Sequence, residues 1–249
     1  MAAFRAELKK AHRRHDLALC FLLPFIIVLW VGGVSPSSPE ELANGYSALL
    51  YSIPVIEAIL LPVMMAVLAS RLWDAEVKGN TLKLLYTLQS RRSLFAGKAV
   101  FGVLEVLLTA ALELSCIPVL GRVHGYTEAF PKGQFLYLFV CTVAVDLMLF
   151  FGEFLLMLWF GNPLPALCVG IVGALVGLFS AFMPPLVSYF VPFGYYIPLG
   201  AYEVANWDKA SHLVTYGTRG YNWGLLAFTI LLGCGLFYAA WRKVQTEEV

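Results

Sequence analysis

Five carboxylic acids interrupt stretches of the sequence that are otherwise apolar. They are Glu57, Glu105, Glu113, Asp146 and Glu153, and neither lysine nor arginine occurs in the same stretches. A charged carboxylate in hydrocarbon costs about 2.5–3.5 kcal/mol or more, so such groups face a protein interior or a wet cavity, or stay protonated. Two interpretations stay open: a path for a cationic amphipathic substrate or for protons, and protonated carboxyls that hydrogen-bond between helices and hold a bundle together.

The spacing of these acids predicts their arrangement. Glu105 and Glu113 are eight residues apart and Asp146 and Glu153 are seven apart, so each pair falls on one face of a helix. Counted from the ends of their apolar stretches, Glu105 and Glu153 lie at a similar inner depth, whereas Glu57 and Glu113 lie toward the outside. We therefore expect a staggered row of acids across the membrane.

Other residue types that could do chemistry are not grouped for it. The five cysteines lie inside apolar stretches without a Cys-x-x-Cys pair, and the four histidines are scattered, so no metal site is expected. The Gly97-Lys98 pair is followed by Ala99 and has Arg92 where a phosphate-binding loop needs its first glycine. We therefore expect no nucleotide site and no cofactor in this chain.

Composition indicates that these residues belong to a lipid-embedded fold. Hydrophobic residues make up 60% of the 249-residue chain and charged residues 13%, and the mean hydropathy is +0.77. A typical soluble domain has about 25% charged residues, so this chain can cover its surface only if much of that surface faces lipid. The composition excludes a soluble globule and a disordered chain. The net charge of +1 gives no reason to expect nucleic acid as a partner.

Six apolar stretches come close to or exceed the roughly 20 residues that a helix needs to span a bilayer. The predicted spans are residues 17–34, 49–70, 99–120, 134–160, 165–190 and 222–241. The first is too long for the apolar region of a signal peptide, about 7–15 residues, and is expected to remain as a span. The sequence thus predicts an all-α integral membrane protein with six transmembrane helices in one domain, residues 1–249.

Two further features refine this picture. Residues 191–221 are rich in aromatic side chains and predict short interfacial or re-entrant helices before the last span. Gly173 and Gly177 form a small-residue surface that permits close approach, and we expect it to pack within the chain rather than at a dimer interface.

The distribution of basic residues predicts the orientation. Only four of the 17 lysines and arginines lie in the loops assigned to the outside, and none lies in a predicted span. The rest lie at the two termini and in the loop of residues 71–98, so the positive-inside rule places both termini in the cytoplasm of a multi-pass cell-membrane protein. Residues 4–16 alternate apolar and basic side chains, which favours a helix lying in the cytoplasmic interface over a plain charged tail.

The long basic loop, residues 71–98, carries two helix signals. A first helical run ends before the breaker pair Gly79-Asn80. Thr81 can then cap a new short helix. The predicted apolar face of that helix consists of Leu82, Leu85 and Tyr86. A short helix between two spans can transmit force from a cytoplasmic partner to both of them.

This loop resembles the permease subunits of type 2 ABC exporters, and most closely their lantibiotic-immunity branch. In that family an acidic residue, here Glu76, and a glycine, here Gly79, precede a segment that reads KLLYTLQSR in this chain, residues 83–91. The family's usual proline before Ser-Arg is Gln89 here, so the local turn can differ. The resemblance covers nearly the whole chain in topology, but its specific residues are confined to about 73–98.

The resemblance implies a coupling element that docks into a cytoplasmic ATPase. Its implied residues are Asp74, Glu76, Gly79, Asn80, Thr81 and Lys83. It also implies a dimer of ABC ATPase subunits that binds ATP and Mg²⁺, a second permease, identical or related, and an amphipathic or hydrophobic substrate. In the immunity branch that substrate is an antimicrobial peptide, expelled from the membrane of the cell that makes it.

Other classes of function also fit an apolar chain of this size. A solvated basic loop that only fixes topology is the simpler interpretation of residues 71–98. An ATP-independent transporter, a membrane-embedded enzyme that uses Glu57 or Glu113 as an acid or base, and a sensor or scaffold are the alternatives. An ATPase that co-purifies with the chain, and is lost when residues 76–83 are disrupted, would separate the ATP-driven transporter from these.

Overall fold

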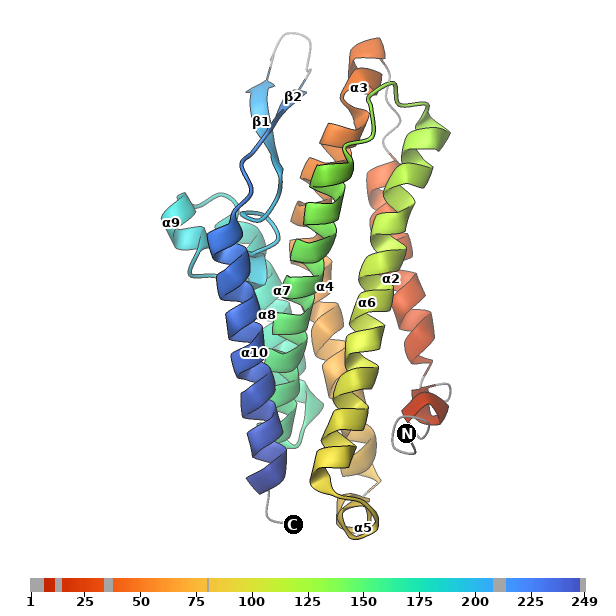
Figure 1. Cartoon of the computed structure of the whole chain (residues 1–249), viewed down its shortest axis with the longest axis vertical. Helices are drawn as coiled ribbons and strands as arrows, with labels where there is room; N and C mark the ends of the chain where they lie inside the picture. Colours follow the sequence, from red (N-terminus) through yellow and green to blue (C-terminus); the bar gives the residue numbers. More distant parts are fainter. Residues whose placement is uncertain (1–6, 12–14, 34–37, 80, 208–213, 247–249) are drawn as a thin grey trace.

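The computed structural model describes residues 7–11, 15–33, 38–79, 81–207 and 214–246, and this part of the chain is a bundle of long helices (Figure 1). The long helices are α2 (Asp16–Gly32), α4 (Gly45–Lys78), α6 (Arg91–His124), α7 (Lys132–Phe160), α8 (Pro163–Ser180) and α10 (Trp223–Thr246). The short ones are α3 (Pro39–Ala43), α5 (Leu82–Leu88), α9 (Pro185–Ser188) and the 3₁₀ helix η1 (Pro192–Gly194). Residues 7–11 are also helical.

Among the described helices, five are long and apolar enough to cross a membrane: α4, α6, α7, α8 and α10. The expected class, a helical membrane protein, is confirmed by them. The first predicted span corresponds to α2, which is apolar but has only 17 residues, so its membrane crossing stays a prediction. Helices α4 and α6 have 34 residues each, about 51 Å at 1.5 Å per residue, and so extend beyond a hydrocarbon core of about 30 Å.

The fifth predicted span, residues 165–190, is wrong at its end. Helix α8 stops at Ser180, and turns lead through the Pro184-Pro185 pair into α9. The prolines explain the stop, because neither has a backbone N–H to donate and each restricts the residue before it to extended conformations. Hydropathy alone does not reveal this break, because the residues on both sides of it are apolar, and the predicted span therefore continues to residue 190.

The prediction of helices across residues 191–221 is also wrong for most of that segment. After η1 the chain forms an antiparallel hairpin of β1 (Tyr202–Trp207) and β2 (Val214–Thr218), with a register shift between Val204 and Asn206. Alternating β-branched and aromatic residues explain the strands, because such side chains pack well on a pleated surface. Tyr202, Trp207 and Tyr216, three of the aromatic residues that suggested membrane-surface helices, belong to the hairpin instead.

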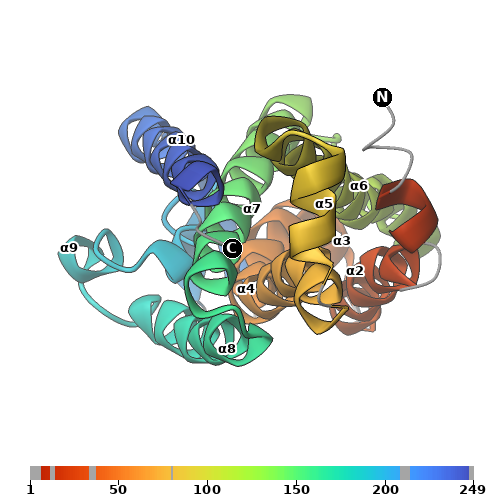
Figure 2. The ribbon, with the colours of Figure 1, turned by 90° about the horizontal axis from the view of Figure 1, so that it is seen from below.

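Helix α4 is central to the bundle and contacts α2, α6, α7 and α8, while α10 packs on α7 (Figure 2). Residues 7–11, α5 and the end of α10 lie at one end of the molecule, called the α5 end below. The hairpin and α3 lie at the opposite end, called the hairpin end (Figure 1). The three basic segments of the sequence therefore meet at one end, as the predicted topology requires.

The small-residue surface of α8 packs within the chain, as expected. A Cβ atom added at Gly177 would lie 2.8 Å from the backbone carbonyl of Phe193, and one at Gly173 would lie 2.4 Å from the Phe193 ring. Backbone cannot give way as a flexible side chain can, so Gly177 is required for the close approach of η1 to α8.

Gly177→Ala should therefore lower the free energy of unfolding by about 1–3 kcal/mol, the usual cost of overpacking. Gly235→Ala is the matched control, because it adds the same methyl group to a helix at a site with nothing within 4 Å. The control should be neutral or slightly stabilising, since alanine favours helix over glycine by about 1 kcal/mol. Thermal unfolding in detergent measures both variants, and equal midpoints would contradict the packing argument.

Candidate coupling site at the α5 end

The junction between α4 and α5 is a tight turn built by the end of α4. The backbone N–H of Gly79 donates to the carbonyl of Ala75 at 3.2 Å, and that of Thr81 donates to the carbonyl of Glu76 at 3.1 Å. The predicted helix end before Gly79 is therefore confirmed. Asn80 and the side chain of Lys83 lie outside the described residues.

Helix α5 is amphipathic, with one side on the bundle and one side exposed. Its predicted apolar face, Leu82, Leu85 and Tyr86, packs against the buried core. Leu84 and Leu88 point elsewhere, with 59% and 72% of their surface exposed. Two large aliphatic side chains are thus presented at the tip of the α5 end, where a partner could cover them.

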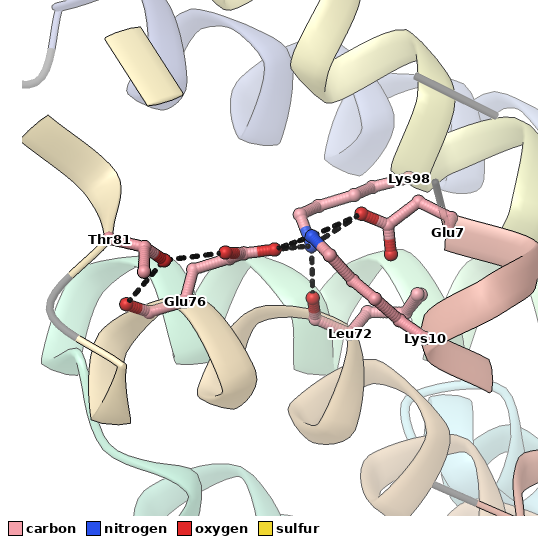
Figure 3. Close-up of polar contacts among 6 residues, drawn as sticks. All are labelled: Glu7, Lys10, Leu72, Glu76, Thr81 and Lys98. Atoms are coloured by element: carbon pink, nitrogen blue, oxygen red, sulfur yellow. Dashed lines mark hydrogen bonds and ion pairs between the residues drawn. The ribbon is translucent and has the colours of Figure 1, made fainter. Parts of the chain in front are cut away.

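The carboxylate of Glu76 is the centre of a buried polar cluster (Figure 3). It accepts hydrogen bonds from Thr81 Oγ1 at 2.8 Å and from Lys98 Nζ at 3.1 Å, and Lys10 Nζ donates to it as well. Thr81 precedes α5 and Lys98 lies in α6. One carboxylate at the end of α4 therefore connects all three elements of the predicted coupling loop with the N-terminal segment.

Lys98 is fully buried, and its ammonium group is surrounded by acceptors. It also donates to the carbonyl of Leu72 and lies 3.3 Å from the carboxylate of Glu7, while Lys10 lies 3.2 Å from the same carboxylate. The cluster of Glu7, Lys10, Glu76 and Lys98, called the charge cluster below, contains two acids and two bases. Their formal charges balance, as a buried group of ions requires.

The pKa of Lys10 is raised above its ordinary value. Burial alone would lower it, but the hydrogen bond to Glu76 and the negative charges of Glu7 and Glu76 outweigh burial. Lys10 therefore stays protonated at neutral pH and keeps the N-terminal helical segment attached to α4. Glu7 and Ala11 face the bundle and Leu8 is exposed, and the location of this segment in the membrane interface stays a prediction.

Two further contacts connect the same elements. Arg71 of α4 forms an ion pair of 3.0 Å with Asp16 at the start of α2. Arg91, at the start of α6, donates to the backbone carbonyl of Gln245 near the end of α10 at 2.7 Å and lies over the ring of Tyr86. A displacement of α5 would therefore be transmitted through α4 to α2 and through α6 to α10.

The implied coupling residues divide into two groups in the structure. Glu76 belongs to the charge cluster, Thr81 donates a hydrogen bond to it, and Gly79 makes the turn. Asp74 instead pairs with Lys78 one helical turn away, at 2.6 Å, where the lysine is exposed and such a pair is worth little. Sequence reasoning missed Lys98 as a functional residue, although a lysine at the edge of an apolar stretch is a usable signal.

Three of the five intramembrane acids come together in the bundle. Glu57 of α4 accepts a hydrogen bond from Thr142 at 2.9 Å, and Asp146 of α7 accepts one from the hydroxyl of Tyr196 at 2.6 Å. Glu113 of α6 lies within electrostatic range of both acids, so charges on the three carboxyls would repel one another. These three carboxyls, called the acid cluster below, come from three helices and are almost fully buried.

The other two acids do not join this cluster. Glu105 lies in α6 and Glu153 in α7, both buried. Neither oxygen of Glu153 has a hydrogen-bond partner within the described part of the chain. The staggered row of five acids stays a prediction, whereas the grouping of three of them was not foreseen. Within the described residues, no group of acids, histidines and cysteines is arranged to hold a metal ion.

Fold and site together define a multi-pass helical membrane protein with a short helix held between two spans at one end. The model of the family described as ABC-2 family transporter protein matches residues 3–191, more than half of the chain. The chain therefore belongs to this family and is a membrane permease subunit that works with an ABC ATPase. No curated protein matches its sequence.

Proposed function

We propose that this permease is the membrane subunit of an ATP-driven exporter and that α5 is the element through which the ATPase acts on it. The observation that carries the proposal is the position of α5, fixed between the ends of α4 and α6 by Glu76, with Leu84 and Leu88 exposed. A protein that binds these leucines can move α5, and α5 cannot move without the helices to which it is bonded.

The charge cluster supports this role because it makes the connection stiff. Hydrogen bonds between charged groups contribute about 1.5–3 kcal/mol each, roughly twice as much as neutral ones. Since the Glu76–Lys98 pair links α4 to α6 directly, a push on α5 would shift both helices together rather than bend the loop between them. The basic residues gathered at the α5 end support a cytoplasmic location for it, where an ATPase would be present.

The substrate that we propose is an amphipathic or hydrophobic molecule, specifically a cationic antimicrobial peptide expelled to protect the cell that makes it. The resemblance of residues 73–98 to the lantibiotic-immunity permeases supports the peptide. The intramembrane acids support its charge, because buried carboxyls in spans that contain no lysine or arginine could bind its amino and guanidinium groups in passing. Glu57, Glu105, Glu113, Asp146 and Glu153 are the proposed path.

The working assembly that we propose contains two ATPase subunits, which bind ATP and Mg²⁺, and a second permease, identical or related. An ATP-independent transporter, a membrane-embedded enzyme and a scaffold remain the competing functions. Membership of the ABC-2 family favours the ATP-driven transporter over all three.

Replacing both exposed leucines, Leu84→Asp with Leu88→Asp, should reduce the amount of ABC ATPase that co-purifies with the permease at least tenfold. Charged groups at the centre of an apolar contact are costly, and about 1.4 kcal/mol already changes binding tenfold. ATP hydrolysis by the purified complex and resistance of cells to a panel of lantibiotics should fall in parallel.

The control is the pair Leu84→Met with Leu88→Met, which keeps the surface apolar and should retain the ATPase. Normal amounts of the aspartate variant in the membrane would show that folding is intact. Retention of the ATPase by the aspartate variant would disprove the docking role of α5. If cells that lack the permease were as resistant to lantibiotics as cells that contain it, the peptide substrate would be disproved, while the docking role of α5 would stand.

A further inference from the structure

A pocket of about 100 Å³ lies at the hairpin end, between the end of α8, α9 and the chain that leads to and from the hairpin. Its lining is mixed: Arg219, Ser180 and Ser188 are polar, and Met183 and Ile197 are apolar. The pocket has several times the roughly 30 Å³ that one water molecule occupies in the liquid, so a phosphate group fits into it.

Arg219 is the basic residue of this pocket. Its backbone N–H donates to the carbonyl of Ala201 at 2.8 Å, which fixes the residue directly after β2. Its guanidinium group has no ion pair, hydrogen bond or aromatic partner within the part of the chain that the structure describes. The hydroxyl of Ser180 donates to the carbonyl of Gly177 at 2.6 Å, so the guanidinium is the main donor available to a ligand.

The surroundings place this pocket at the level of lipid headgroups. The rings of Tyr137, Tyr221 and Trp223 form a group, with 4.4 Å between the centroids of the two tyrosines. Asn222 between them donates to the hydroxyl of Tyr189, next to α9, at 3.3 Å. Tyrosine and tryptophan concentrate at membrane–water interfaces, where one side of the ring is apolar and the other wet.

An apolar ridge borders the same pocket. Phe182, Leu186 and Phe190, before, within and after α9, have 81%, 71% and 79% of their surface exposed. Figure 2 shows α9 at the edge of the bundle beside α8, away from the central helix α4. Large apolar side chains exposed at an interface are stable there when acyl chains cover them.

We propose that this pocket binds the phosphate of an anionic membrane phospholipid, with Arg219 bonded to the phosphate oxygens and the lipid's acyl chains against the α9 ridge. Arginine is suited to this ligand because its planar guanidinium can donate two parallel hydrogen bonds to one phosphate group. A free phosphate ion would use the arginine but leave the ridge uncovered, so the combination of both features favours the lipid.

Native mass spectrometry of the full chain, purified in detergent and titrated with short-chain phosphatidylglycerol, tests the proposal. The wild type should retain one tightly bound lipid, and Arg219→Gln should weaken its binding at least tenfold, as loss of a charge-assisted bidentate contact implies. Arg122→Gln is the matched control, because Arg122 also lies toward the hairpin end, in the last turn of α6, but not in this pocket.

A second variant, Arg219→Lys, keeps the charge and should bind with intermediate strength. Phosphatidylcholine, which carries the same phosphate without net charge, should bind more weakly than phosphatidylglycerol. Equal lipid retention by Arg219→Gln and Arg122→Gln would overturn the site. Displacement of the lipid by millimolar inorganic phosphate would overturn the choice of ligand in favour of a free anion.

Discussion

Lys98→Met should lower the free energy of unfolding by about 3 kcal/mol, one of the largest effects expected from a single side chain here. The substitution keeps most of the apolar stem of the side chain but leaves the buried carboxylates of Glu76 and Glu7 with Lys10 as their one shared cation among the described residues. Removing one partner of a buried ion pair typically costs about 3–5 kcal/mol. The lower value applies because Lys10 and Thr81 still donate to Glu76. Thermal and denaturant unfolding in detergent measures the loss.

A double-mutant cycle separates the ion pair from the packing of the lysine stem. Glu76→Gln combined with Lys98→Met should be less destabilising than the sum of the two single changes, because the second change removes a charge that the first left unpaired. Asp74→Asn is the control, since its pair with Lys78 is exposed, and it should change stability by less than about 0.5 kcal/mol. If Lys98→Met were as mild as this control, the charge cluster would not hold the α5 end together.

Hydropathy and helical spacing explain which parts of the fold the sequence predicts well. Hydropathy locates α4, α6, α7 and α10 because a span needs a long apolar stretch, whatever it packs against. The spacing of Leu82, Leu85 and Tyr86 predicts the buried face of α5 because three or four residues make one helical turn. Both kinds of signal are local, so no knowledge of the tertiary structure is needed to use them.

The charge cluster was missed because it depends on contacts between residues that are distant in the sequence. Lys98 and Glu76 are 22 residues apart, and Lys10 and Glu76 are 66 apart, so no local pattern reveals that these charges meet. The hairpin was missed for a different reason. Aromatic residues are typical both of membrane interfaces and of β-strands, and composition alone does not separate the two in residues 191–221.

The acid cluster gives the second large expected effect, this time on transport. The triple variant Glu57→Gln, Glu113→Gln and Asp146→Asn should reduce resistance to a cationic antimicrobial peptide at least tenfold. Carboxamides are nearly the same size as carboxylic acids and can still accept the hydrogen bonds from Thr142 and Tyr196. The bundle should therefore stay folded while its capacity to attract a cationic group is lost.

Glu153→Gln is the matched control, because it also neutralises a buried acid of α7 but one without a charged neighbour within the described part of the chain. Although Glu153 belongs to the proposed path, Glu153→Gln should reduce resistance only slightly, because it removes one isolated acid and leaves the three acids of the acid cluster in place. If the triple variant kept full resistance at normal amounts in the membrane, the acids would have only the structural role that hydrogen-bonded carboxyls can fill between helices. The permease would then select its substrate by another surface. The coupling role of α5 would be unaffected, because that role depends on the charge cluster and on the exposed leucines at the α5 end.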